Sequence, residues 1–217
     1  MKHARWLPSR RGVLALLAGG ALVSCGRKRA RARPVPKGAL VIALGDSLTF
    51  GTGATTETAY PAELARLTGW EVVNAGVPGD TAAQARERLP ALLDTAGAQL
   101  LILSIGGNDF LRRLPEADTR AHIEAVCDTT LARGVQVMLL AVPRPSLSAA
   151  IGSLTDHPMY ADIAAARAVV LQREGWSEVL ADSDLRSDAI HANARGYAQQ
   201  ARNIVATARA AGLLPLS

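Results

Sequence analysis

From about residue 40 to the end of the chain, short apolar runs alternate with longer segments in which apolar residues recur at helical spacing. The runs predict strands at Leu40–Leu44, Glu71–Asn74, Leu100–Ser104, Gln136–Val142 and, most weakly, Glu178–Ala181. The longer segments predict helices at Tyr60–Leu67, Thr81–Leu93, Glu116–Arg133, Pro158–Arg173 and Asn193–Ala211. This alternation predicts an α/β domain in which a parallel sheet is covered by helices on both faces.

Local signals mark some element ends. Thr81, followed three residues later by Gln84, is typical of a capping box, and Gly134 is typical of a helix C-terminus. The segment Pro143–His157 shows no periodicity and is interpreted either as a lid or as an ordinary surface connection. Cys127 falls on the apolar face of a predicted helix, which favours a small buried side chain over a disulfide.

The charge is divided unevenly along the chain. The whole sequence carries a net charge of +5, but residues 1–37 hold 10 of its 24 Lys and Arg and no acid, which leaves 14 basic against 19 acidic residues and a net charge of −5 for residues 38–217. An acidic body argues against nucleic-acid binding.

The first 25 residues predict an export signal. Basic residues precede the apolar run Gly12–Val23, which is too short for a membrane span of roughly 20 residues. Leu22-Val23-Ser24-Cys25 resembles a bacterial lipobox, which implies lipidation of Cys25, and Ser9–Leu14 resembles a twin-arginine signal. An ordinary cleaved signal remains the alternative. We therefore expect a location in the bacterial cell envelope, on the periplasmic side, with the membrane contacted through a lipid anchor.

Residues 26–37 combine six basic residues with two prolines, which predicts a disordered tether. A single domain is then expected over residues 38–217.

Three polar motifs sit where this domain would place its chemistry. Gly45-Asp46-Ser47-Leu48 ends the first predicted strand, Gly106-Gly107-Asn108-Asp109 ends the third, and Asp188-Ala189-Ile190-His191 lies near the end of the chain. Ester hydrolysis needs an activated hydroxyl, a base, an anion that orients the base, and oxyanion donors. Ser47, His191, Asp188 and the Asn108 amide supply these, with a further backbone donor expected from the glycine-containing loop 74–81.

Each residue also has a simpler interpretation. Ser47 alone could cap a helix, and Asn108 alone could belong to a turn. The other histidines, His3, His122 and His157, are interpreted as ordinary surface groups.

Together, the motifs resemble the SGNH hydrolases, also called GDSL esterases and lipases, and most of all the bacterial periplasmic thioesterase, lysophospholipase and arylesterase branch. Gly45-Asp46-Ser47-Leu48, Gly79-Asp80-Thr81, Gly107-Asn108-Asp109 and Asp188–His191 match the family blocks in order, over about residues 40–211. The resemblance implies catalytic Ser47, Asp188 and His191 and an oxyanion hole of the Ser47 N–H, the Gly79 N–H and the Asn108 side chain.

The same resemblance implies a three-layer, flavodoxin-like α/β/α sandwich with a five-stranded parallel sheet in the order 2-1-3-4-5, with no cofactor and no metal. It makes Asp46 and Asp109 structural, holding loops through backbone N–H groups. Pro143–His157 departs from the acyl-chain loop expected of a thioesterase, so it does not indicate an acyl preference.

The leading hypothesis is a monomeric serine esterase that cleaves small-molecule or lipid esters, such as aryl esters or lysophospholipids. A carbohydrate O-deacetylase of the same fold is a second hypothesis, which the small number of aromatic residues disfavours. A non-catalytic envelope binding lipoprotein is a third, and the intact set of four polar residues disfavours it.

Overall fold

The computed structural model describes residues 1, 3, 32–94, 97–144 and 154–215. The strands are β1 (Leu40–Gly45), β2 (Glu71–Gly76), β3 (Ala98–Ser104), β4 (Gln136–Leu140) and β5 (Val170–Gln172). The helices are α1 (Ser47–Phe50), α2 (Tyr60–Thr68), α3 (Ala82–Leu93), α4 (Gly107–Leu111), α5 (Glu116–Ala132), α6 (Met159–Arg167), α7 (Gly175–Ala181) and α8 (Ala194–Ala211), with short 3-10 turns at Thr56–Thr58 and Ser183–Leu185.

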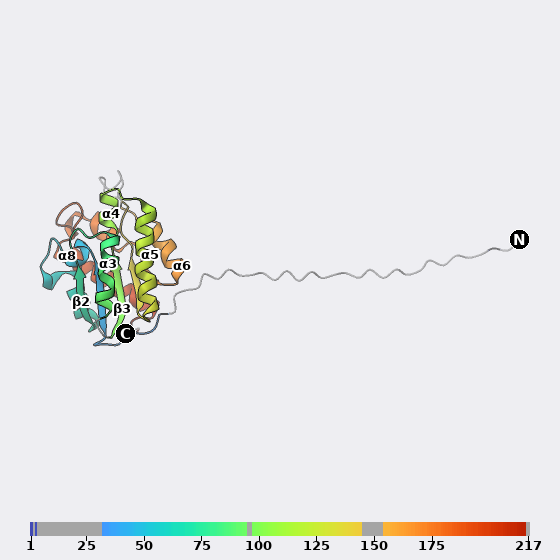
Figure 1. Cartoon of the computed structure of the whole chain (residues 1–217), viewed down its shortest axis with the longest axis horizontal. Coiled ribbons are helices and arrows are strands. Elements are labelled where there is room, and N and C mark those ends of the chain that lie inside the picture. The colour runs from blue at the N-terminus through green and yellow to red at the C-terminus, as the bar shows by residue number, and fades with distance from the viewer. Residues whose placement is uncertain (2, 4–31, 95–96, 145–153, 216–217) are drawn as a thin grey trace.

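The five strands form one parallel sheet in the order β2-β1-β3-β4-β5, which confirms the predicted fold class. Helices α3, α5 and α6 pack together on one face, and α2, α7 and α8 pack together on the other (Figure 1). The central strands β1 and β3 are almost wholly buried, as their continuous apolar runs predict. All carboxyl ends of the strands therefore lie at one edge of the sheet.

The prediction of a fifth strand at Glu178–Ala181 was wrong, because these residues end helix α7. Trp176, Val179 and Leu180 are spaced to bury one face of that helix, so a short apolar run was helical. The true β5 lies inside the predicted helix 158–173. Helix α6 ends at Arg167, and Ala168 at φ +51° turns the chain into the three-residue strand.

The prediction of a disordered tether was wrong for residues 33–37. Val35 is buried, its N–H donates to the Leu213 carbonyl, and its carbonyl accepts from the Trp70 indole. The Arg33 backbone also exchanges two hydrogen bonds with the Gln136 side chain at the start of β4. Pro34 and Pro36 restrict the backbone around Val35 to extended conformations, so little further entropy is lost when the Val35 side chain is buried against the domain. Residues 26–31 and the predicted export signal, with Cys25, lie outside the described residues.

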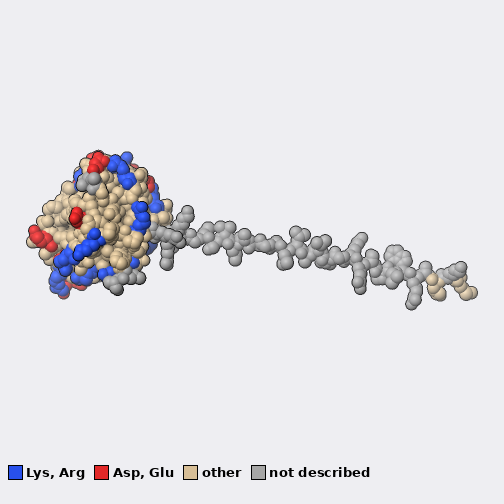
Figure 2. Space-filling view, turned by 90° about the horizontal axis from the view of Figure 1, so that it is seen from below, with Lys and Arg blue, Asp and Glu red and all other residues tan. Residues whose placement is uncertain are grey.

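Other local predictions hold. Thr81 and Gln84 form the capping box of α3, and Gly134 at φ +75° follows the end of α5. Cys127 is buried, and burial raises the pKa of its thiol to about 12. Figure 2, which looks at the lower end of the domain, shows Lys and Arg side chains on the same face as Asp and Glu. In the part of the chain that the structure describes, no helix is long and apolar enough to span a membrane.

Candidate active site

Ser47 is the first residue of α1, immediately beyond the carboxyl end of β1. Asp46, not Ser47, caps this helix, because its carboxylate accepts from the Leu48 N–H at 3.0 Å. The hydroxyl of Ser47 is thus available for another partner. The turn is tight, since a Cβ on Gly45 would meet Thr49 Oγ1 at 2.2 Å and the Ser104 carbonyl at 2.3 Å. Only glycine allows the chain to bend this closely against β3.

The loop before α8 brings Asp188 and His191 to that hydroxyl. An isolated antiparallel bridge pairs Arg186 with Ala192 and folds the loop back on itself. His191 Nε2 lies 3.0 Å from Ser47 Oγ, and His191 Nδ1 lies 2.8 Å from Asp188 Oδ2. The arrangement favours the tautomer in which Nδ1 donates to the carboxylate and Nε2 accepts from the serine. Ser47, His191 and Asp188 therefore form one hydrogen-bonded relay.

The Asp188 carboxylate is held by more than the imidazole. Its Oδ1 accepts from the N–H groups of Ile190 and His191, both at 2.8 Å. Burial alone would raise the pKa of Asp188, but the bonds from the His191 side chain and from these two N–H groups outweigh it and lower the pKa. The carboxylate is thus ionised at neutral pH and can stabilise a positive imidazole.

Asn108 enters the site from α4, which follows β3. Gly106 at φ +111° turns the chain into this helix, and a Cβ there would lie 2.6 Å from the Tyr160 hydroxyl. Asn108 Nδ2 donates to the Asp80 carbonyl at 2.9 Å and lies 3.4 Å from Asp46 Oδ2. Both neighbours are acceptors, so the amide is oriented with its NH₂ group toward them.

Gly79 precedes Asp80 in the loop after β2 and has φ +85°. Its carbonyl accepts from Arg112 Nη2 at 2.7 Å. Among the contacts of the described residues, neither the Gly79 N–H nor the Ser47 N–H has an acceptor. Gly79 is linked to Asn108 by the next residue, Asp80, whose carbonyl accepts from the Asn108 amide. Gly79 is not among the residues that line the cleft over Ser47.

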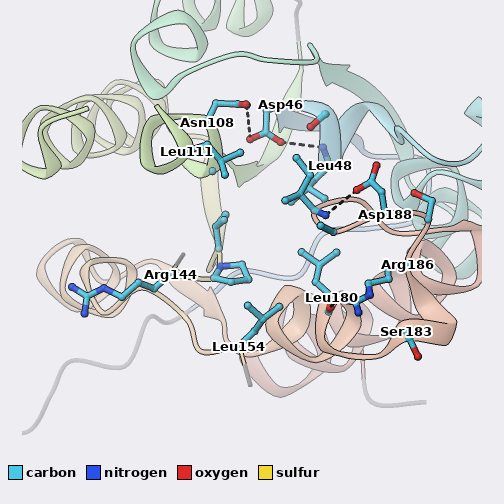
Figure 3. Close-up of a pocket in the computed structure, with 17 residues that line it drawn as sticks. Asp46, Leu48, Asn108, Leu111, Arg144, Leu154, Leu180, Ser183, Arg186 and Asp188 are labelled. Carbon is cyan, nitrogen blue, oxygen red and sulfur yellow. Dashed lines mark hydrogen bonds between the residues drawn. The ribbon is translucent and has the colours of Figure 1, made fainter. Parts of the chain in front are cut away.

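A cleft of about 700 Å³ opens over Ser47 and Asn108 (Figure 3). Its described apolar lining consists of Leu48, Leu111, Val142, Pro143, Leu154, Leu180, Ala189 and Ile190. The described ends of the 143–157 segment border the cleft, where they pair through an antiparallel Pro143–Asp156 bridge. Residues 145–153 lie outside the described residues.

The structure brings together four of the predicted site residues, Ser47, Asn108, Asp188 and His191. Sequence reasoning did not identify the apolar lining, which comes from residues far apart in the chain, such as Leu111, Leu154 and Leu180. Asp46 and Asp109 both accept from backbone N–H groups, of Leu48 and Ala82 respectively. Among the described residues, no group of three or more His, Cys, Asp or Glu side chains could hold a metal ion.

The interpretation of His157 as a surface group was wrong. Its side chain is 4% exposed and stacks on Phe110 of α4 with ring centroids 4.6 Å apart. Burial lowers its pKa more than Glu116 raises it. Nδ1 accepts from the Met159 N–H, so the neutral ring presents its Nε2 proton to Glu116 at 3.5 Å.

Comparison with known proteins bears on this arrangement. The sequence model of the GDSL-like Lipase/Acylhydrolase family matches residues 43–199. This span contains Ser47, Asn108, Asp188 and His191. The esterase TesA of Pseudomonas aeruginosa is 32% identical over 110 residues, which cover 48% of this chain and 55% of that protein. Thioesterase 1/protease 1/lysophospholipase L1 of Escherichia coli K12 is 32% identical over 110 residues, 49% of this chain and 52% of that protein.

The aligned part of the chain thus spans about half the length of these curated relatives. Structural similarity extends further. The crystal structure of TesA superposes with a TM-score of 0.71 at 25% identity and covers 79% of this chain and 99% of that one. Almost all of the TesA structure thus has a counterpart in this chain, and the two have the same fold.

Proposed function

This chain belongs to the GDSL-like lipase/acylhydrolase family, and from that membership we propose that it is a serine ester hydrolase that acts through an acyl-enzyme on Ser47. The observation that carries the proposal is the relay from Ser47 Oγ through His191 to Asp188, with hydrogen-bond distances of 3.0 and 2.8 Å. These are the distances at which a base can take a hydroxyl proton while an anion orients the base.

In the proposed reaction, Ser47 Oγ attacks the ester carbonyl carbon and its proton moves to His191 Nε2. The oxyanion of the tetrahedral intermediate accepts from the Ser47 and Gly79 N–H groups and from the Asn108 N–H that faces Asp46 at 3.4 Å, while the other Asn108 N–H stays on the Asp80 carbonyl. His191 then returns the proton to the leaving alcohol as the ester C–O bond breaks. Water attacks the acyl-enzyme by the same route, which releases the acid and regenerates Ser47.

The cleft supports esters with an apolar acyl part. Leucine, isoleucine and valine make up six of the eight apolar residues named above, and a volume of about 700 Å³ is within the range of ligand pockets. We therefore propose aryl esters or lysophospholipids as substrates. The aromatic residues Tyr60, Tyr160, Tyr197 and Trp176 are all buried, and none of the described lining residues is aromatic. The described lining of the cleft thus offers no ring for stacking on a sugar, which weighs against the O-deacetylase alternative.

The test of this function is Ser47→Ala assayed on p-nitrophenyl esters of increasing chain length. The substitution removes the nucleophile and little buried area, so we expect kcat to fall by at least about 10³-fold with thermal unfolding unchanged. Ser183→Ala serves as the matched control, because Ser183 lines the same cleft outside the relay and is expected to retain activity within about threefold. A Ser47→Ala variant that kept a tenth of the wild-type activity would rule out Ser47 as the nucleophile.

We also propose that the protein is held in the bacterial envelope by lipid on Cys25, on the sequence pattern alone. Two acyl chains on one residue give stable membrane association where one does not. Cys25→Ser, expressed in a bacterial host, is expected to abolish palmitate labelling and to release the protein from the membrane fraction. Labelling that persists in the variant would disprove this anchor.

A further inference from the structure

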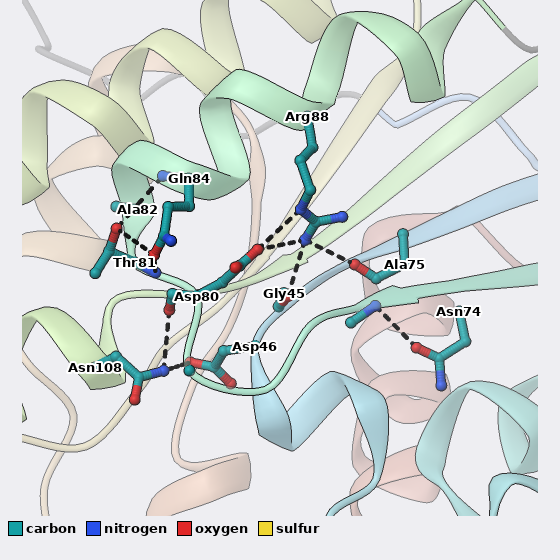
Figure 4. A network of polar contacts seen from close by, with 12 residues as sticks. Gly45, Asp46, Asn74, Ala75, Asp80, Thr81, Ala82, Gln84, Arg88 and Asn108 are labelled. Carbon is teal, nitrogen blue, oxygen red and sulfur yellow. Dashed lines mark hydrogen bonds and ion pairs between the residues drawn. The ribbon is translucent and has the colours of Figure 1, made fainter.

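Arg88 lies on α3, outside the cleft, yet its guanidinium meets the carboxyl ends of two strands (Figure 4). Its Nη2 donates to the Ala75 carbonyl of β2 at 3.1 Å and to the Gly45 carbonyl of β1 at 3.4 Å. Its Nε and Nη2 also lie 2.9 and 2.7 Å from Asp80 Oδ2. One cation therefore joins β1, β2 and the loop that follows β2.

Asp80 connects this cation to the amide of Asn108. The Asp80 backbone carbonyl accepts from Asn108 Nδ2 at 2.9 Å, while its carboxylate pairs with Arg88. The side chain of Asp80 is only 8% exposed, so the pair is screened much less than a surface ion pair. Without Arg88 the carboxylate would be left largely buried and unpaired, and the loop would move to hydrate it.

Two of the proposed oxyanion donors also lie within two residues of groups that Arg88 contacts. Gly79 immediately precedes Asp80, and Ser47 is two residues beyond Gly45. The Gly45 carbonyl accepts from the Val77 N–H at 3.1 Å, so the same acceptor links β1 to the start of the Gly79 loop. Arg88 thus contacts the Gly45 and Ala75 carbonyls and the carboxylate of Asp80, the residue whose carbonyl accepts from Asn108.

We propose that Arg88 is a positioning residue for the oxyanion hole: it fixes the Asp80 carbonyl and the ends of β1 and β2 so that the Asn108 amide and the Gly79 loop stay in register with Ser47. The inference rests on the proposed esterase function and assigns Arg88 no contact with substrate. A guanidinium suits this role because its planar fork holds five N–H donors in a fixed geometry over three nitrogens, whereas an ammonium has three donors on a single atom.

The first test compares Arg88→Met with Arg86→Met on the same helix. Arg86 is exposed, and within the described residues its guanidinium has a polar contact only with the His122 ring, at 3.4 Å. A displaced oxyanion donor weakens transition-state binding more than ground-state binding, so Arg88→Met is expected to lower kcat by about 10- to 100-fold with KM within about threefold. Arg86→Met is expected to stay within twofold of the wild type. Arg88→Lys keeps the charge but not the fork and is expected to recover only part of kcat.

A double-mutant cycle separates positioning from loss of stability. Each variant is assayed at least 10 °C below its own unfolding midpoint, on the same soluble p-nitrophenyl ester. If Arg88 acts through Asn108, Arg88→Met should cost less than about threefold in an Asn108→Ala background, because the donor is already absent. Equal costs in both backgrounds, or equal kcat for Arg88→Met and Arg86→Met, would overturn the proposal. A wild type without Ser47-dependent hydrolysis would instead overturn the proposed function.

Discussion

Asp46 stands next to the proposed nucleophile and is a buried carboxyl group that forms no ion pair with another described residue. Its Oδ1 accepts from the Leu48 N–H at 3.0 Å, and its Oδ2 lies 3.4 Å from Asn108 Nδ2. The pKa of Asp46 is raised from 3.8 to about 7. Burial is the main cause and the nearby Asp109 adds to it, and together they outweigh the Leu48 N–H and His191, which lower the pKa. Asn at this position has almost the same shape, can still accept from Leu48, and carries no charge.

The sign of the effect follows from linkage. The unfolded chain ionises Asp46 near pH 3.8, whereas the folded chain keeps the proton until about pH 7. The contribution of Asp46 to the unfolding free energy is therefore greatest at low pH and falls as pH rises toward and through the folded pKa. One pKa unit corresponds to about 1.36 kcal/mol, so the loss between pH 5 and pH 8 is about 2–3 kcal/mol. Asp46→Asn removes this loss.

The measurement is urea unfolding of wild type and Asp46→Asn at pH 5 and pH 8. We expect the variant to gain about 2–3 kcal/mol relative to the wild type on going from pH 5 to pH 8. Asp94→Asn, a change to an exposed surface carboxylate, is expected to shift the unfolding free energy by less than about 0.5 kcal/mol at either pH. A difference between Asp46→Asn and wild type that is the same at both pH values would refute the reasoning.

Three further outcomes are expected. Asn108→Ala should lower kcat by about 10²–10³-fold with little change in KM, and a rise in KM alone would make the amide a substrate-binding group. His157→Gln should flatten the fall in urea stability below about pH 6.5, because burial lowers the His157 pKa and acid must charge a buried ring; an unchanged slope would contradict this. Cys127, buried and with its pKa raised to about 12, should resist iodoacetamide at pH 8 until the protein unfolds, which mass spectrometry can follow.

Those parts of the site that depend on short stretches of sequence could be predicted. Ser47 follows a run that is buried on both faces, and the three-residue spacing of Asp188 and His191 needs only one turn to bring their side chains together. The contacts of Arg88 could not be predicted in the same way. They join residues up to 43 positions apart, and nothing in the spacing of α3 distinguishes Arg88 from the exposed Arg86.

The incorrect predictions share a physical cause: the environment of these residues is set by contacts with residues far away in the sequence, which a local pattern does not contain. Leu180 belongs to a short apolar run whose pattern predicts a strand. In the folded domain this run is part of helix α7, because Trp176, Val179 and Leu180 are buried together on one face of that helix. Val35 is a single apolar residue in a basic segment, yet a partner 178 residues later accepts its N–H. His157 is the last residue of the segment without periodicity, and its ring is covered by Phe110 of α4.

The position of the described N-terminal segment limits how the two proposals combine. Arg33 contacts the start of β4, whereas Ser47 and Asn108 follow the carboxyl ends of β1 and β3. The segment lies near the C-terminus, at the end of the sheet opposite α4 (Figure 1). The cleft over Ser47 and Asn108 lies at the α4 end. A domain of this size is about 40 Å across. The seven residue-to-residue steps from Cys25 to Ala32 span at most about 25 Å. An enzyme anchored at Cys25 would therefore present its cleft away from the bilayer that holds it, which favours esters arriving from the aqueous side over lipids of that same bilayer.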